Sequence, residues 1–365
     1  MKPPKFFFLL LLATIFACRG QNAPEAGAVQ PALELGDTVP ALSKDIWYIF
    51  QASNGDYWFG SASDGAYRYD GKVLLYFSAA DGLGSGGIRG IQEDKKGQIF
   101  FTTLAGISKF DGQSFQTLEP VIANGPEEHW ALQADDLWFS TLGKEGEQGP
   151  SRYDGEKLYQ LQFPKHHLAD AYFAEFPDKP WSPYDVYSIY RDRKGQVWFG
   201  TSNFGVGRYD GKSLGWLYED HLTNTPEGGS FGIRSILEDA EGKYWFCNNR
   251  FRYDIAAGVS DADGKALLEY RRSPGIRGLS TARGADHIYF FSVVEDAAGD
   301  LWMVTYDEGV WRYDGQSVTH YPVKKGTKDL SLFSLYQDRK GELWVGTHEA
   351  GVYKFDGTNF VPFVL

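Results

Sequence analysis

One unit recurs seven times along this chain, and that repetition constrains the fold more than any other feature. The clearest copy reads VYSIYRDRKGQVWFGT at residues 186–201 and continues as GVGRYDG at residues 205–211. The centres of the other copies are YWFG at 57–60, IFFT at 99–102, LWFS at 137–140, YWFC at 244–247, LWMV at 301–304 and LWVG at 343–346. An aromatic residue and Asp follow every centre. Gly comes next in six copies, and Ile255 replaces it in the fifth. Such a period indicates units that pack on one another.

The letters of one unit predict a four-stranded antiparallel meander. A segment of the VYSI type forms the first strand, an Asp-x-x-Gly turn follows, and the second strand carries the Trp. A short turn leads to the third strand, and Asp-Gly is a strong hairpin signal into the fourth. Small sheets of this kind bury their faces only against each other. The predicted fold is therefore all-β, a seven-bladed β-propeller of four-stranded antiparallel blades over residues 45–365. The aromatic side chain on each second strand is expected to fill the wedge between blades.

Composition and charge exclude one class of partner. Hydrophobic residues make up 42% of the chain and aromatic residues 16%, which is enough for a large core. The formal net charge is -12. Nucleic acid is not an expected partner, because affinity for a phosphate backbone comes from Lys and Arg.

The N-terminus has the pattern of an export signal. A short basic segment, residues 1–5, precedes an apolar run, residues 6–16, that is too short to span a bilayer. Its end, up to Ala17 and Cys18, resembles the bacterial lipobox, although Phe16 is bulky for its position. We predict a lipoprotein signal peptide at residues 1–17, a lipidated Cys18 with a flexible tether at 18–44, and a membrane-anchored protein facing the periplasm or the cell surface. The alternative is an ordinary signal peptide that contains a Cys. Cys247 is the only other cysteine, so no disulfide framework is expected.

Together, the seven copies with their landmarks in one order resemble the two-component regulator propeller repeats found in periplasmic sensor regions of bacterial hybrid histidine kinases. The resemblance covers residues 45–365 and implies a sensory propeller. The third copy departs from the pattern, with a shortened turn at residues 134–136 and an insertion at 141–150. No kinase follows Leu365, so we expect recognition without kinase activity.

Three long segments are expected on one face of the propeller. Residues 156–185 and 255–286 connect a fourth strand to the next first strand, and the 141–150 insertion joins a second strand to a third. Because both kinds of connection lie on the same face, and loops vary where scaffolds carry function, this face is the predicted binding face.

Aligning the first strands locates a candidate site at the mouth of the central channel on that face. The position two before the common Ile is occupied by five aromatic residues and two arginines: Trp47, Arg89, Trp130, Tyr187, Arg234, Phe291 and Phe333. Asn203, Arg250, Tyr306 and His348, from nearby turns, are secondary candidates. This composition suits stacking on a planar ligand or sugar ring while an anionic group is held. The alternative is that these side chains plug the channel or pack between blades.

Signals for catalysis are sparse. The seven histidines show no metal-ligand spacing, and no nucleophile elbow or phosphate-binding loop is present. We therefore expect no catalytic residues, metal or cofactor, and a protein that binds a small molecule, a glycan fragment or an envelope partner. One alternative is a lyase or hydrolase with an axial metal, similar to streptogramin lyases, for which His287, His348 and Glu349 are the residues to examine. Another is a structural module of an envelope complex.

Overall fold

The computed structural model describes residues 35–140, 149–225, 229–260, 264–279 and 288–365. The chain divides into two units, Met1–Glu34 and Leu35–Leu365, and the second is described here. The predicted signal peptide, Cys18 and the first part of the predicted tether lie outside the described residues, as does most of the 141–150 insertion. Within the described ranges, none of the helices has the length and apolar character needed to cross a membrane.

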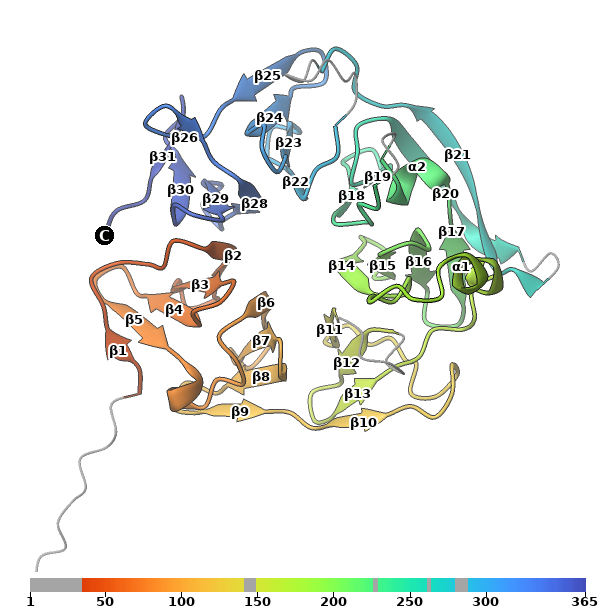
Figure 1. The fold of residues 1–365 in the computed structure, drawn as a ribbon, viewed down its shortest axis with the longest axis horizontal. Helices are drawn as coiled ribbons and strands as arrows, with labels where there is room; N and C mark the ends of the chain where they lie inside the picture. The colour runs from red at the N-terminus through yellow and green to blue at the C-terminus, as the bar shows by residue number, and fades with distance from the viewer. Residues whose placement is uncertain (1–34, 141–148, 226–228, 261–263, 280–287) are drawn as a thin grey trace, which may run out of the picture. The chain divides into compact units, whose positions relative to one another are not determined.

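The unit Leu35–Leu365 is built almost entirely of small sheets placed around a common centre, each with one edge strand innermost (Figure 1). The first two sheets comprise β2 (Ile46–Gln51), β3 (Tyr57–Ser61), β4 (Ala66–Tyr69) and β5 (Leu74–Phe77), then β6 (Ile88–Glu93), β7 (Ile99–Thr103), β8 (Gly106–Phe110) and β9 (Phe115–Thr117). The last two comprise β22 (Ser292–Glu295), β23 (Leu301–Val304), β24 (Val310–Tyr313) and β25 (Val318–Tyr321), then β28 (Leu332–Gln337), β29 (Leu343–Thr347), β30 (Val352–Phe355) and β31 (Phe360–Pro362). These four sheets follow the predicted meander.

The remaining elements complete the ring of sheets. They are β11 (Leu137–Phe139), β12 (Ser151–Tyr153) and β13 (Leu158–Gln160) in the third sheet, β14 (Val186–Arg191), β15 (Val197–Thr201), β16 (Val206–Tyr209) and β17 (Leu214–Leu217) in the fourth, and β18 (Ile236–Glu238), β19 (Tyr244–Phe246), β20 (Phe251–Ser260) and β21 (Leu267–Pro274) in the fifth. Outside these sheets lie the short helices η1 (Ala79–Asp81), α1 (Ala169–Glu175) and α2 (Asp220–Thr223) and the hairpin β26 (Lys324–Lys325) and β27 (Lys328–Asp329).

The third sheet differs from the expected meander at its inner edge. Residues 130–136 form no strand, and β10 (Pro120–Ile122) instead pairs with β13 in parallel at the outer edge. The shortened turn before Leu137 explains part of this difference. Four copies with a full turn bond the Trp ring N–H to an Asp six residues earlier, as Trp198 does to Asp192 at 2.9 Å. The residue six before Trp138 is Leu132, and the Trp138 Nε1 has no hydrogen-bond partner.

The fifth sheet corrects the prediction that residues 255–286 form a simple connection. Where Ile255 replaces the turn glycine, the strand continues as β20 and pairs with β21 in a long hairpin. This hairpin joins the fourth sheet through the pairing of β17 with β21, so the two sheets form one order of eight strands. The buried Arg208 guanidinium strengthens the junction by donating to the carbonyls of Ala256 and Ala257, both at 2.7 Å.

Neighbouring sheets pack through the aromatic side chains of their second strands, which confirms the structural role predicted for them. Trp198 lies with Tyr244 and Phe246 of the next sheet in one buried cluster. The glycine two residues after the Trp permits the close approach. A Cβ on Gly200 would lie 2.4 Å from the Ile233 carbonyl oxygen of the following sheet.

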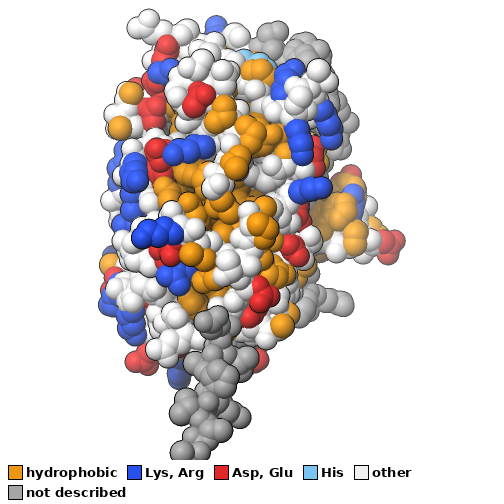
Figure 2. Space-filling model, turned by 90° about the vertical axis from the view of Figure 1, so that its left-hand side faces the viewer, with side chains coloured by type: hydrophobic (Ala, Val, Ile, Leu, Met, Phe, Trp, Pro, Cys, Tyr) orange, Lys and Arg blue, Asp and Glu red, His pale blue; other side chains and the backbone are white. Residues whose placement is uncertain are grey.

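The last sheet closes against the first by side-chain packing. Within the described residues, the sheet β28–β31 takes no strand from the N-terminal part of the unit. The contacts are a shared cluster around Trp344 and Ile46, and a hydrogen bond of 2.6 Å that the Tyr57 hydroxyl donates to Asp338. Figure 2 shows this side of the molecule, where hydrophobic side chains gather in the middle and Lys and Arg surround them.

The segment before β2, placed in the predicted tether, packs on the first sheet in part. The strand β1 (Asp37–Thr38) pairs antiparallel with β5, and the Val39 N–H donates to the Leu74 carbonyl at 3.0 Å. The compact unit therefore begins at Leu35, ten residues before the predicted boundary.

Candidate ligand site at the channel mouth

Four inner strands carry a bulge at the position that the sequence alignment singles out. In β2 the pairing with β3 shifts between Ile46 and Tyr48, so Trp47 has no opposite residue. The same shift occurs in β6, β14 and β28, at Arg89, Tyr187 and Phe333. A bulge leaves one residue out of the ladder and turns its side chain out of the regular alternation. This local irregularity directs all four side chains toward the mouth.

The mouth holds a cavity of about 600 Å³. Six of the seven predicted mouth residues line it, namely Trp47, Arg89, Tyr187, Arg234, Phe291 and Phe333, together with the secondary candidates Tyr306 and His348. The alignment of first strands therefore brings together residues from six of the seven copies, separated by as much as 286 positions, into one cavity.

The other three candidates lie elsewhere, which corrects their predicted place. Trp130 packs in the wedge between the third and fourth sheets, where its Nε1 donates to the Gln162 carbonyl at 3.0 Å and its ring centroid lies 4.9 Å from that of Tyr209. Because no inner strand forms at this position, the Trp130 side chain is not directed toward the axis. Asn203 lines a different groove beside α1. The Arg250 guanidinium lies 5.5 Å from the ring of its neighbour Phe251 and does not line the mouth.

Aromatic rings form a continuous wall on one side of the mouth. Trp47 stacks on Phe333 with centroids 4.2 Å apart and planes at 13°. Phe333 contacts Phe291 at 5.4 Å, and Phe291 contacts Tyr306 at 5.7 Å. Offset and tilted contacts of this kind fix ring orientations, so the wall offers a preformed apolar surface.

The two arginines contact different rings of this wall. The Arg89 guanidinium is 4.8 Å from the Trp47 ring, and the Arg234 guanidinium is 4.6 Å from Tyr187 and 5.0 Å from Phe291. Arg89 donates to the carbonyls of Ala62 and Ile88, and Arg234 donates through Nε to the Phe231 carbonyl at 3.0 Å. No carboxylate of the described residues forms an ion pair with either guanidinium. Burial lowers the pKa of Arg234, as expected for a charge without an anionic partner.

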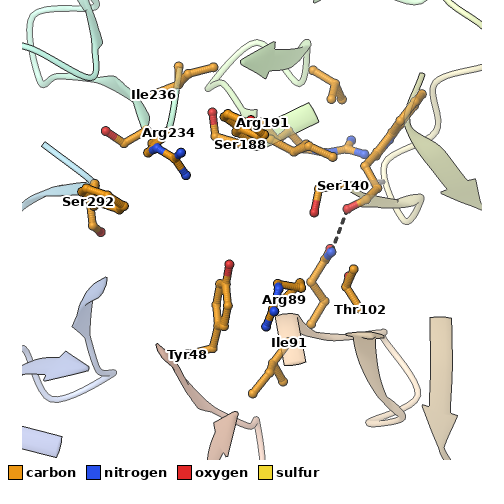
Figure 3. Close-up of a pocket in the computed structure, with 18 of the residues that line it drawn as sticks. Tyr48, Arg89, Ile91, Thr102, Ser140, Ser188, Arg191, Arg234, Ile236 and Ser292 are labelled. Atoms are coloured by element: carbon orange, nitrogen blue, oxygen red, sulfur yellow. Dashed lines mark hydrogen bonds between the residues drawn. The ribbon is translucent and has the colours of Figure 1, made fainter. Parts of the chain in front are cut away.

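A second cavity of about 440 Å³ continues from the mouth into the channel (Figure 3). The two cavities share Tyr48, Arg89, Ser140, Tyr187, Arg234, Phe291 and Ser292. In Figure 3 the side chains of Tyr48, Arg89 and Arg234 point into the same space. Burial raises the pKa of Tyr48 to about 12, and the positive charges of Arg89 and Arg234 oppose that shift. The hydroxyl is therefore a neutral donor between two cations at physiological pH.

The residues one position before the common Ile were missed by the sequence analysis. Tyr48, Gly90, Ser188, Ser235, Ser292 and Ser334 hold this position in six copies, and each lines a cavity; Ala131 holds it in the third copy. Aligning this column would have shown four serines and a tyrosine among seven residues, a polar composition unusual for an inner strand.

Three polar atoms of residues at the mouth are buried without a hydrogen-bond partner: Trp47 Nε1, Ser334 Oγ and His348 Nε2. A buried polar atom left unpaired costs about 1–3 kcal/mol, so such atoms are rare in folded proteins. Their grouping around one cavity adds three possible contacts for a polar ligand.

Of the three residues named for an axial metal, the structure describes two, and both make other contacts. His287 lies outside the described residues. The His348 ring is enclosed by Trp47, Tyr306 and Phe333, and burial lowers its pKa. Glu349 forms an ion pair with Lys328 at 3.0 Å. In the ranges the structure describes, no three His, Cys, Asp or Glu side chains are grouped so that they could hold a metal ion.

Comparison with known families identifies the repeat. The model of the two-component regulator propeller family matches residues 180–203 and 328–349, which lie in the fourth and last sheets. This confirms the resemblance inferred from the sequence. No curated protein matches the sequence significantly.

Solved structures confirm the propeller-like, all-β fold. The extracellular domain of a putative hybrid two-component system from B. thetaiotaomicron has a TM-score of 0.56 at 17% identity, covering 87% of this chain and 39% of that one. Virginiamycin B lyase from Staphylococcus aureus has a TM-score of 0.59 at 15% identity, covering 87% and 96%. PorZ, a surface component of the type-IX secretion system of Porphyromonas gingivalis, has a TM-score of 0.54 at 16% identity, covering 87% and 48%. The chain thus spans about two-fifths of the length of the first of these proteins.

Proposed function

From the two-component regulator propeller repeats in this chain, we propose that residues 45–365 form a seven-bladed propeller that binds a ligand at the channel mouth. The proposal includes export, lipid attachment at Cys18 and a recognition role. The seven copies in the sequence and the sheets around one centre support the blade count. The likeness to an extracellular domain of a putative hybrid two-component system supports the recognition role.

One observation carries the binding role: two guanidinium groups without a carboxylate partner among the described residues face one aromatic-walled cavity. Arg has five N–H donors, and Arg234 uses one of them in the contact it makes with Phe231. A partly buried cation without a counter-ion is costly, and a bound anion removes that cost. The arrangement is therefore better suited to a ligand than to a plug.

The geometry favours a small ligand with a flat face and an anionic group. The flat face would stack on the wall of Trp47, Phe333 and Phe291, while the anion would lie between Arg89 and Arg234 with the Tyr48 hydroxyl as a donor. An acidic glycan fragment and an aromatic carboxylate both present this combination. A cavity of about 600 Å³ accommodates a ligand of that size.

The test is a thermal-shift screen of the protein lacking residues 1–18 against acidic and neutral glycan fragments and aromatic acids, with calorimetry on each hit. Replacing Arg89 and Arg234 together with Ala should weaken binding of an acidic hit at least a hundredfold and leave the fold intact. Lys243→Ala, which removes a half-buried cation outside the mouth, serves as the matched control. Unchanged affinity in the double variant would exclude this site.

A second candidate is a lyase, favoured by the fold similarity to virginiamycin B lyase. The enclosure of His348 and the pairing of Glu349 with Lys328 give it less support from the site. Turnover of a hit that stops on chelation and returns with a divalent metal would establish it. Turnover is not expected from the recognition role.

The third candidate is a structural module of an envelope complex, favoured by the fold similarity to PorZ and by the hydrophobic side chains in Figure 2. Val361 and Val364 are exposed on the C-terminal strand and tail. Co-purification of a stable envelope complex that Val361→Asp disrupts, with no small-molecule hit in the screen, would establish this role.

A further inference from the structure

A second hollow lies beside α1 and shares no lining residue with the channel mouth. It is a groove of about 620 Å³ between the segment that carries α1 and the turns of the fourth sheet that lead to α2. The segment belongs to the long connection of residues 156–185, which the sequence analysis placed on the binding face without assigning it a role.

Exposed aromatic rings form one side of this groove. Trp181 and Phe176 line it and keep 37% and 36% of their surface exposed. Tyr172 contacts Phe176 with centroids 5.1 Å apart and is held by the hydrogen bond that its hydroxyl donates to Asn203 at 3.2 Å. Large rings left exposed in a connection, rather than folded into the core, form an apolar surface available to a ligand.

Amides, hydroxyls and a carboxylate form the other side. Asn203 donates to Ser230 Oγ at 3.0 Å, and Asn224 donates to Asp220 Oδ1 at 2.7 Å. Each amide nitrogen has two N–H donors and uses one of them in these contacts, and Thr225 adds a hydroxyl. The polar groups are thus oriented by the protein and retain capacity for a ligand.

The charges in the groove argue against a strongly ionic ligand. Glu175 and Asp220 would repel an anion, whereas the Lys179 ammonium lies 4.5 Å from the Trp181 ring and 5.1 Å from Phe176, where an incoming cation would have to sit. A neutral ligand meets no charge repulsion and would stack on the rings beside the Lys179 side chain.

We propose that this groove binds a neutral saccharide. A pyranose ring has an apolar C–H face, which fits against an aromatic ring, and hydroxyl groups around its edge, which both donate and accept hydrogen bonds. The groove supplies both surfaces: rings from Phe176 and Trp181, and mixed donors and acceptors from Asn203, Asn224 and Asp220.

The experiment is calorimetry of the full chain with four neutral tetrasaccharides as probes, built from β-1,4-glucose, α-1,4-glucose, β-1,4-mannose and β-1,4-xylose units. At least one probe should bind. Trp181→Ala should weaken that binding about tenfold or more, because it removes the exposed stacking surface, and Trp181→Phe should retain most of it. Far-ultraviolet circular dichroism and the unfolding midpoint verify that each variant is folded.

Two control variants establish whether a probe binds in this groove or elsewhere on the protein. Phe173 lies in α1 and is 43% exposed, but it does not line the groove. Phe173→Ala should therefore leave the affinity for the probe unchanged. The Arg89→Ala, Arg234→Ala double variant should also bind the probe normally, so a failure of the mouth proposal leaves this one standing. Absence of binding by all four probes, equal affinity in Trp181→Ala, or Trp181-dependent binding of tetramethylammonium without saccharide binding would each overturn the proposal.

Discussion

Two rows of large side chains run around this protein, one residue from each repeat, and they differ in what surrounds them. The first row, here the wedge row, lies on the second strands. It comprises Trp58, Phe100, Trp138, Trp198, Trp245, Trp302 and Trp344, and every member is buried. The second row, here the mouth row, lies at the start of the first strands and lines a cavity in six of seven copies. Similar residue types thus serve as core in one row and as the wall of a cavity in the other.

Hydrogen bonding separates the two rows. The indole N–H groups of Trp198, Trp245, Trp302 and Trp344 donate to an Asp six residues earlier at 2.8–3.0 Å. In the second row, Trp47 Nε1 is buried without a partner. These four core positions therefore satisfy the indole N–H within the repeat, whereas Trp47 at the mouth leaves its N–H unpaired. Trp138, in the copy with the shortened turn, is the exception in the first row, because its Nε1 is also unpaired. This contrast can be tested by removing one member of each row.

The largest effect is expected from Trp198→Ala. Trp198 is fully buried against the fifth sheet, so its loss should lower the free energy of unfolding by about 4 kcal/mol. Phe333→Ala, in the mouth row, should cost about 1 kcal/mol because its ring is partly buried and borders a cavity. Urea unfolding of both variants measures the difference. Equal costs would mean that the mouth row is core as well.

Closure of the ring depends on the same wedge packing, and Gly346→Ala should disrupt it. A Cβ at this position would lie 2.6 Å from the Ile46 carbonyl oxygen, where the last sheet meets the first. The first and last sheets must separate to admit it, so we expect a loss of about 2–3 kcal/mol in the free energy of unfolding. Gly125→Ala is the control, since nothing lies within 4 Å of its Cβ position. If both variants unfold at the same urea concentration, the closing contact is looser than the structure indicates.

Acid should destabilise the fold through the buried His166 side chain. His166 is almost fully buried, stacked on Phe204, and burial lowers its pKa to about 3. The unfolded chain protonates this ring near pH 6.5, so stability declines as the pH falls from about 6.5 toward 3. At pH 5 the contribution amounts to about 2 kcal/mol.

His166→Asn keeps an acceptor for the Leu168 N–H and removes the titration. The loss of unfolding free energy between pH 7.5 and pH 5 should therefore be about 2 kcal/mol smaller in this variant than in the natural chain. His129→Asn, at an exposed histidine, should leave the loss unchanged. A loss of the same size in His166→Asn would show that other groups cause the acid sensitivity.

The repeat made the fold predictable, and its irregular copies account for the errors. Motifs such as Trp-x-Gly and Asp-Gly specify local turns and the close approach of neighbouring sheets. Each regular meander could therefore be inferred from the sequence of its own copy. The long hairpin of β20 and β21 depends on the absence of one glycine at Ile255 and on the carbonyls that Arg208 reaches 48 and 49 residues away. No local pattern specifies contacts at that separation.

The candidate site was predictable to the extent that copies share a strand register. Alignment located Trp47, Arg89, Tyr187 and Phe333 because the same bulge recurs at each. It failed at Trp130, where the inner strand is missing, and it assigned Asn203 to the wrong cavity because the fold of the 156–185 connection has no counterpart in other copies. The groove beside α1 was missed for the same reason.

The smallest expected effect on stability distinguishes the two rows most directly. Arg234→Met replaces a partly buried guanidinium that has no carboxylate partner among the described residues by an apolar side chain of similar length. Removing an uncompensated charge should raise the free energy of unfolding by about 1 kcal/mol in low-salt buffer, whereas substitutions in the wedge row lower it.

The same variant should also lose the response to anions. Adding 2-naphthoate, a planar carboxylate, should raise the unfolding midpoint of the natural chain by mass action and leave that of Arg234→Met unchanged. Lys243→Met, at a half-buried lysine that pairs with Asp254 outside the mouth, should respond to naphthoate like the natural chain. If Arg234→Met instead destabilises the protein, this arginine contributes to the core. The mouth row would then have the same structural role as the wedge row and would not be a ligand-binding surface.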